Sequence, residues 1–117
     1  MHVRFADRTL IRRREDGDIW TGLYEFPMIE TDVETGLDDL SRTPDWQTFF
    51  DGQTPVVKAA SPVVTHRLTH RILKIRFYEI SVIRPVRGKN IIEISANDIH
   101  RYAVPKVIDN YLTRYTI

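Results

Sequence analysis

Hydrophobic and polar residues alternate most clearly between residues 72 and 83, which predicts a β-strand. The apolar positions are Leu73, Ile75 and Phe77 and then, one position out of step, Ile80 and Val82. A one-residue slip suggests a bulge near Phe77-Tyr78, because each slip moves the apolar set to the other face. Residues 63–65 are the expected antiparallel partner, which leaves residues 66–71 as a hairpin loop.

Shorter patterns predict further strands. Residues 8–14 and 91–95 each combine branched apolar and polar positions and are expected to be strands, the second after a turn at 87–90. Residues 15–18 have the composition of a turn. Residues 19–29 are expected to form short extended pieces joined by a bend, because Gly22 and Pro27 interrupt them.

Helical spacing is confined to three places. Asp45 is the expected N-cap of a short helix that carries Trp46, Phe49 and Phe50. Asn97 is the expected N-cap of a single helical turn over residues 98–102. Pro105 suits the first turn of a last helix. The apolar stripe of that helix consists of Val104, Ile108, Tyr111, Leu112 and Tyr115. Residues 31–45 are expected to be a surface excursion. Strands followed by a C-terminal helix define an α+β domain with a mostly antiparallel sheet.

The chain has 117 residues, which predicts a single domain over residues 1–117. No apolar run approaches the ~18 residues of a membrane span, and no basic segment followed by an apolar stretch opens the chain, so the expected location is cytoplasmic with no membrane partner. The absence of cysteine excludes disulfides, thiolate zinc sites and iron–sulfur clusters within this chain.

The net charge of +1 conceals a separation of charge. Residues 25–51 contain eight acidic side chains and one basic side chain, and residues 62–88 contain six basic side chains and one acidic side chain. This separation indicates a basic face on a nearly neutral molecule. The alternative is that the acidic segment pairs with the basic one or that both segments are solvated.

Catalytic and metal chemistry find little support in the sequence. His66 and His70 are four residues apart, but zinc needs three or four protein ligands and the other two histidines have no paired spacing. No serine lies in a nucleophile turn, and the five glycines are scattered singly. We therefore expect no metal site and no catalytic residue in this chain.

Residues 61–78 combine a tight loop with cations and hydroxyls. Cations neutralise phosphates, and a hydroxyl such as that of Thr69 can read a base edge. The segment is therefore either a nucleic-acid contact or a solvated polar hairpin.

Three motifs add to this interpretation. They are Leu10-Ile11-Arg12-Arg13-Arg14 followed by Ile19-Trp20-Thr21-Gly22-Leu23-Tyr24-Glu25-Phe26-Pro27, then His66-Arg67-Leu68-Thr69-His70, then Tyr102-Ala103-Val104-Pro105-Lys106. In this order and spacing the chain resembles the C-terminal domain of the MutY-type adenine DNA glycosylases. The resemblance implies a Nudix-like α+β fold, in which a mostly antiparallel mixed sheet packs with helices and one helix lies at the C-terminus.

The chain departs from the related Nudix hydrolases after Pro27. Those enzymes continue into a helix with an R-E-x-x-E-E motif that holds magnesium, and here Met28 to Gly36 contains no such motif. We therefore expect no nucleotide hydrolysis. In the family, a separate N-terminal domain with a catalytic carboxylate and a 4Fe-4S cluster excises the adenine. The resemblance thus implies that this chain is a piece of a longer enzyme. It implies that the piece holds no cofactor and that its first strand is shortened.

In the family, this domain helps recognise 8-oxoguanine opposite adenine. The resemblance implies that residues 66–71 are the lesion- and DNA-binding site: Thr69 contacts the oxidised base, Leu68 forms an apolar wedge, and Arg67, Arg71 and more weakly Lys74 contact phosphates. His66 and His70 flank the loop, with His70 favoured as the DNA-facing residue. The implied partners are duplex DNA with an 8-oxoguanine:adenine mispair and the N-terminal catalytic domain. Two alternatives stay open: a hydrolase of oxidised nucleoside triphosphates with an atypical metal site, and a protein-interaction module using the acidic segment.

Overall fold

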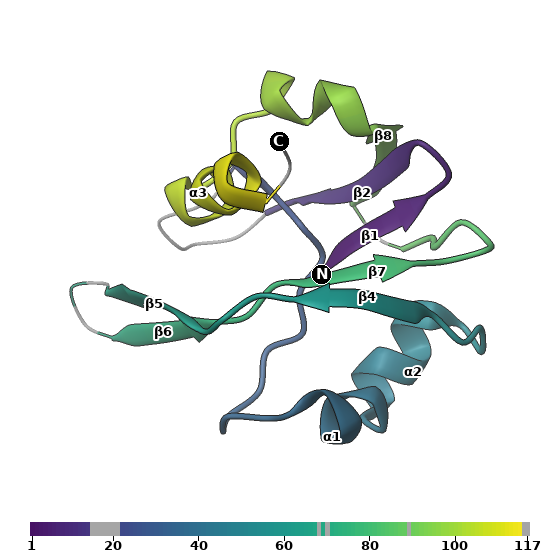
Figure 1. Ribbon diagram of the computed structural model, residues 1–117, viewed down its shortest axis with the longest axis horizontal. Coiled ribbons are helices and arrows are strands. Elements are labelled where there is room, and N and C mark those ends of the chain that lie inside the picture. Colours follow the sequence, from purple (N-terminus) through teal and green to yellow (C-terminus); the bar gives the residue numbers. More distant parts are fainter. Residues whose placement is uncertain (15–21, 68, 70, 89, 116–117) are drawn as a thin grey trace.

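The computed structural model describes residues 1–14, 22–67, 69, 71–88 and 90–115. It has one six-stranded sheet, one separate hairpin and a few short helices (Figure 1). The strands of the six-stranded sheet are β1 (His2–Phe5), β2 (Arg8–Arg13), β3 (Tyr24–Glu25), β4 (Val56–Ala60), β7 (Tyr78–Ser81) and β8 (Ile91–Ser95). The hairpin consists of β5 (Val64–Arg67) and β6 (Ile72–Ile75). The helices are α1 (Leu37–Ser41), α2 (Pro44–Phe50), the 3-10 helix η1 (Ala96–Arg101) and α3 (Lys106–Tyr115).

The sheet runs β3-β2-β1-β7-β4, with β8 also paired to β2. Thr9 of β2 pairs with Arg4 of β1 and with Ile94 of β8, so β1 and β8 lie on opposite edges of β2. β1 and β7 are parallel and the other pairings are antiparallel. The expected α+β class and mostly antiparallel mixed sheet are therefore confirmed.

Each face of this sheet buries its own hydrophobic cluster, because successive residues of a strand point to opposite faces. Leu10 of β2 lies in the cluster covered by α1 and α2, whereas its neighbour Ile11 lies in the cluster covered by α3. The first cluster includes Trp46 and Phe50, whose rings are 4.7 Å apart. The helices thus form layers on opposite sides of the sheet (Figure 1).

The expected strand over residues 72–83 is two strands, β6 and β7, interrupted at Arg76 and Phe77. The slip therefore marks a change of sheet rather than a bulge within one strand. Ile75 and Phe77 face the cluster under α3, whereas Tyr78 and Ile80 face the cluster over α2. Ser61 holds the break in place: Phe77 N donates to Ser61 Oγ at 2.9 Å, and Ser61 N donates to Phe77 O at 2.8 Å.

Two expected caps are wrong. Thr43, not Asp45, caps α2: its hydroxyl accepts from Trp46 N at 3.3 Å, and Pro44 occupies the first turn. Ser95, not Asn97, precedes η1, and no side chain caps that helix. The surface excursion over residues 31–45 contains α1, whose Leu40 is buried against the sheet.

The last helix is confirmed as α3, which begins at Lys106, one residue after Pro105. Of its expected apolar stripe, Val104 and Leu112 are half-buried, and the side chain of Tyr115 lies outside the described residues. Ile108 and Tyr111 are buried, and Val107, absent from the expected stripe, is buried with them. Among the described residues, no helix is long and apolar enough to cross a membrane.

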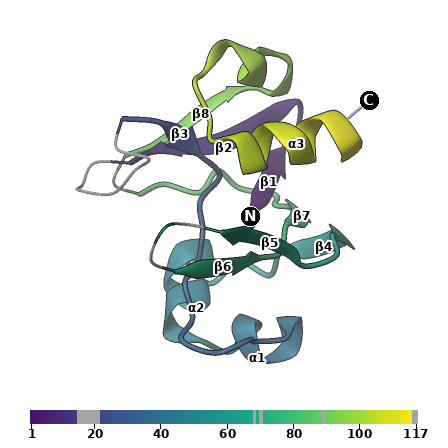
Figure 2. The same cartoon turned by 90° about the vertical axis from the view of Figure 1, so that its left-hand side faces the viewer.

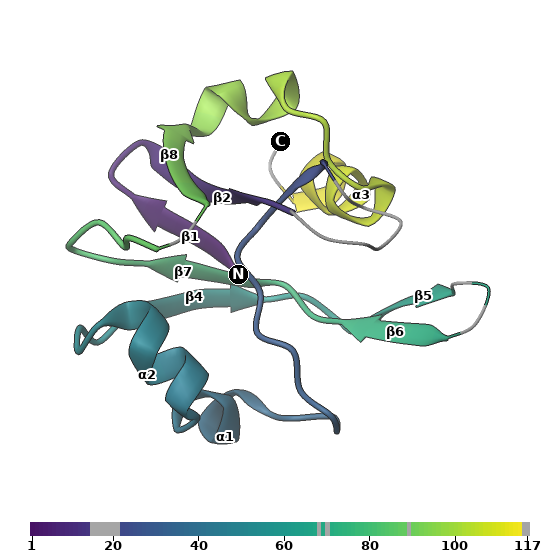
Figure 3. The ribbon, with the colours of Figure 1, turned by 180° about the vertical axis from the view of Figure 1, so that it is seen from behind.

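The β5–β6 hairpin extends past the end of the sheet, as the views from the front and from behind show (Figures 1 and 3), and it points toward the viewer in Figure 2. Its base leads through Arg76 and Phe77 into β7, which lies between β1 and β4 in the sheet. The expected loop over residues 66–71 is too long, because His66 and Arg67 belong to β5. Thr69 and Arg71 follow β5 and are exposed.

Candidate nucleic-acid interface

The register of the hairpin assigns its side chains to two faces. Arg67 pairs with Ile72 and Thr65 with Lys74, while His66 pairs with Leu73 and Val64 with Ile75. Directly paired residues share a face and neighbouring residues do not. The first two pairs are therefore on one face and the last two pairs on the other.

Burial distinguishes these faces. His66, Leu73 and Ile75 are half-buried, and Ile75 packs against the cluster under α3. Val64, on the same side at the start of β5, is 37% exposed. We call this side of the hairpin the inner face. Four residues of the opposite side are exposed to solvent: Thr65, Arg67, Ile72 and Lys74. We call these four residues the outer face.

The structure divides the predicted site between these surfaces. Arg67 is exposed on the outer face, and Thr69 and Arg71 are exposed in the loop. His66 is on the inner face, directed away from Arg67. Leu68 and His70 are outside the described residues. Ile72 lies directly opposite Arg67, a pairing that the sequence did not predict because Arg67 was expected in the loop.

Two members of the arginine run, Arg12 and Arg14, form ion pairs with Glu25. Glu25 is 1% exposed. Arg12 Nη2 lies 2.7 Å from Glu25 Oε1, and Arg14 Nη1 lies 2.9 Å from Glu25 Oε2. Arg12 and Glu25 face each other across β2 and β3, which explains the contact. Arg13 points outward and is exposed. The run therefore anchors β3 more than it provides a surface for anions.

A small cavity lies between the base of the hairpin, β3 and the start of α3. Its volume is about 60 Å³, and the side chains of Phe26, Ile75, Phe77 and Ile108 contribute to its mainly apolar lining. An engineered cavity that binds benzene has about 150 Å³. A nucleobase therefore does not fit here without rearrangement.

The acidic segment does not form a metal site in the described part of the chain. Among the described residues, no three histidine or carboxylate side chains lie close enough together to hold a metal ion. Seven acids from residue 30 to residue 51 are exposed over α1, α2 and the segment before them: Glu30, Asp32, Glu34, Asp38, Asp39, Asp45 and Asp51. Within the described ranges, no ion pair joins any of them to the cations of residues 62–88. Ion pairing between the two segments is therefore wrong for these residues.

The fold and this surface define an α+β domain with a layered sheet and a projecting polar hairpin. The model of the NUDIX domain matches residues 1–114 of the chain. The chain therefore belongs to the NUDIX domain family. No curated protein matches it.

Proposed function

We propose that the chain is the lesion-recognition domain of a MutY-type adenine DNA glycosylase, which recognises 8-oxoguanine opposite adenine. The observation that carries the proposal is the projecting hairpin, whose loop exposes Thr69 between the cations Arg67 and Arg71. The NUDIX family membership and the three sequence motifs support the same proposal.

The proposed recognition rests on one change of hydrogen-bond polarity. Oxidation converts guanine N7 from an acceptor into an N–H donor and adds an oxygen at C8. The hydroxyl of Thr69 accepts from that N7–H or donates to the new C8 oxygen. Arg67 and Arg71 would bind phosphates beside the lesion and fix the position of the loop.

The chemical step belongs to another part of the proposed parent enzyme. Excision of adenine is assigned to an N-terminal catalytic domain, which is also the proposed partner of this domain. The chain contains no cysteine, so a cysteine-bound 4Fe-4S cluster would be held by that other domain alone. Tethering the two domains would raise the effective concentration of this one at the lesion.

The test is a fluorescence-anisotropy titration of the chain with two duplexes, which differ only in guanine or 8-oxoguanine opposite adenine, at low and moderate salt. The proposal predicts tighter binding to the oxidised duplex. Equal affinity for the two duplexes would refute lesion recognition by this chain.

Thr69→Ala is expected to reduce the preference for the oxidised duplex by roughly 5- to 150-fold, the equivalent of about 1–3 kcal/mol for one base contact. Affinity for the unmodified duplex should change little, because the variant removes no charge. Thr48→Ala is the matched control, since Thr48 is also an exposed threonine but lies on α2, outside the hairpin. An unchanged preference in Thr69→Ala would exclude the proposed contact.

Arg67→Ala and Arg71→Ala are each expected to weaken binding to both duplexes and to flatten its salt dependence by about 0.9 in the slope of log K against log salt. Each arginine replaced leaves one phosphate un-neutralised. The same titration over four salt concentrations measures the slope. Slopes equal to that of the wild type would show that neither cation contacts phosphate.

A further inference from the structure

Met28 places a thioether sulfur beside the buried ion pairs of β3. Arg14 Nη1 lies 3.8 Å from Met28 Sδ, and the same nitrogen donates to both carboxylate oxygens of Glu25, at 3.1 Å and 2.9 Å. A thioether sulfur is only a weak hydrogen-bond acceptor, so Arg14 stays with the carboxylate. Any change that makes this sulfur a stronger acceptor would therefore act on the contact between Arg14 and Glu25.

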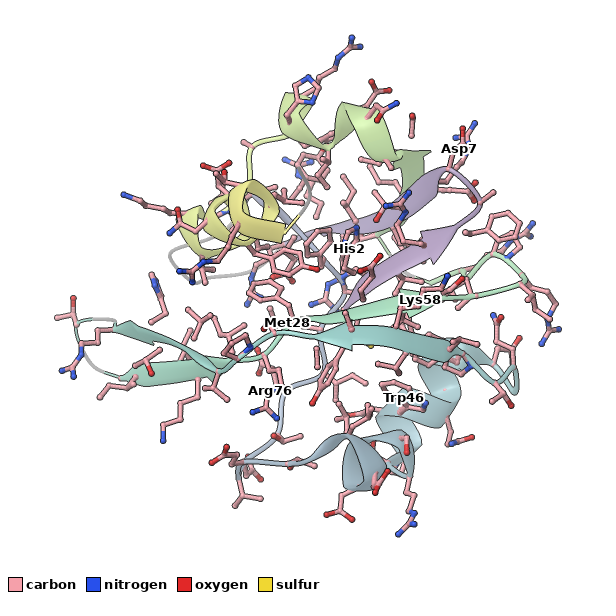
Figure 4. All side chains as sticks on the ribbon, viewed as in Figure 1. His2, Asp7, Met28, Trp46, Lys58 and Arg76 are labelled. Carbon is pink, nitrogen blue, oxygen red and sulfur yellow. The ribbon has the colours of Figure 1, made fainter. Side chains whose placement is uncertain are left out.

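Met28 also lines the small cavity at the base of the hairpin, together with Arg76 and Phe77 (Figure 4). The cavity has a volume of about 60 Å³. A water-sized group needs roughly 10–15 Å³, so the cavity has room for a side chain that is larger by one oxygen atom. Met28 is half-buried and Arg76 is exposed, so solvent reaches this edge of the cavity.

The other methionine of the chain provides an internal comparison. The sequence contains two methionines, and Met1 is 8% exposed within the hydrophobic cluster that includes Val3 and Leu10. Oxidation of a methionine to its sulfoxide depends on access of the oxidant to the sulfur. Met28 is therefore the methionine that a dissolved oxidant meets first.

We propose that Met28 is a site of reversible oxidation by peroxide, and that its sulfoxide oxygen competes with Glu25 for Arg14. In this step the sulfur lone pair attacks one oxygen of hydrogen peroxide and the O–O bond breaks, which gives the sulfoxide of Met28 and one water molecule. The sulfur is oxidised and the peroxide is reduced, so no further reactant is needed. The inference concerns a modification of the domain and does not depend on the proposed function.

Oxidation would weaken the attachment of β3 to β2. The sulfoxide is polar, so Arg14 Nη1 gains a second strong acceptor next to Glu25. Among the described residues, Arg14 is the donor to Glu25 Oε2, while Arg12 binds Oε1. When Arg14 turns to the sulfoxide, a buried carboxylate oxygen loses its hydrogen bond, which lowers the stability of the folded domain. Reduction of the sulfoxide by methionine sulfoxide reductases would restore it.

The experiment treats the folded chain with hydrogen peroxide, measures the added oxygen at each methionine by peptide mass mapping, and follows thermal unfolding. Met28 should be oxidised at least about tenfold faster than Met1 in the folded chain, and at a similar rate in urea, where burial no longer separates them. The Tm should fall by about 3–8 °C, the shift that the loss of about one hydrogen bond produces in a domain of this size. Treatment with the reductases for both sulfoxide epimers and a thiol should restore the Tm.

Two variants assign the effect to these atoms. Met28→Leu nearly conserves the volume of the side chain and removes the sulfur, so its Tm should not change on treatment with peroxide. Arg14→Gln removes the guanidinium for which the sulfoxide competes. This variant should be less stable from the start, and oxidation of its Met28 should lower the Tm by less than in the wild type.

Three results would overturn the proposal. Equal oxidation rates of Met1 and Met28 in the folded chain would show that Met28 is not a preferred site. An unchanged Tm after complete oxidation of Met28, or a fall in Met28→Leu equal to that of the wild type, would show that this sulfur does not control stability. A fall in Arg14→Gln as large as in the wild type would refute the competition for Arg14, and Met28→Leu still tests the site if Arg14→Gln does not fold.

Discussion

Glu25→Ala is expected to lower the free energy of unfolding by about 3–5 kcal/mol. The substitution removes the buried carboxylate that Arg12 and Arg14 share and with it both of these ion pairs. It also leaves a void at a residue that is 1% exposed. Urea denaturation at neutral pH measures the change.

A surface ion pair provides the control for this variant. Asp98 lies 3.7 Å from Arg101, whose side chain is 73% exposed, and Asp98→Ala should change the unfolding free energy by less than about 0.5 kcal/mol. A loss of under 1 kcal/mol in Glu25→Ala would show that the buried pair contributes little. It would also remove the reason for excluding Arg12 and Arg14 from the DNA surface.

The second large effect is a loss of stability in acid, caused by His2. The imidazole is 4% exposed, stacks on Phe26 with ring centroids 4.8 Å apart, and has Nδ1 3.1 Å from the hydroxyl of Tyr111 (Figure 4). Burial lowers the pKa of His2 from 6.5 to about 4, and the charge of Arg4 adds to this effect. The unfolded chain therefore binds a proton near pH 6.5, and the folded protein only near pH 4.

Protonation of His2 consequently favours unfolding between these two values. Its contribution to stability is complete above pH 6.5 and is lost as the pH falls toward 4, by about 2–3 kcal/mol at pH 4.5. His2→Phe should lose less stability than the wild type between pH 7 and pH 4.5. His100→Gln, at an exposed position, should lose as much as the wild type. Equal losses in His2→Phe and the wild type would contradict this assignment.

The sequence pattern predicted the hairpin that bears the candidate site well. Alternation between residues 72 and 75 predicted β6, because alternate residues there differ in burial. The apolar residues before the loop predicted only the start of β5, which continues to Arg67. The same alternation led to a wrong prediction at Phe77-Tyr78, where a bulge was expected within one strand. A one-residue slip in the alternation looks the same in the sequence whether a strand bulges or passes from one sheet into another. The hydrogen bond from Phe77 N to Ser61 Oγ, which the sequence does not predict, holds the break between the two sheets.

The local sequence patterns of β1, β4 and α1 were too weak to predict these elements. β1 contains a histidine and an arginine among its four residues, and its place in the sheet depends on β2 and β7. β4 has consecutive apolar residues and an irregular register between Val57 and Ala59, so it lacks a clear alternation. α1 has five residues and buries only Leu40, which is too short for helical spacing to be visible.

The roles of the arginines required the structure. Arg12 and Arg14 find Glu25 more than ten residues further along the chain, through the pairing of β2 with β3. No local pattern indicates which cation of a run will be paired in this way. The roles assigned to His66, Arg67, Leu68, Thr69, His70 and Arg71 in binding DNA stay predictions.

The central claim is that the chain contacts DNA through the hairpin. Its most direct test follows the backbone amide signals of the ¹⁵N-labelled chain in solution as a duplex with one 8-oxoguanine:adenine mispair is added. The account predicts shifts for residues 64–75 and none for α1 and α2. Shifts centred on α1, α2 or the acidic residues, or no shifts at a duplex concentration that saturates binding, would contradict it.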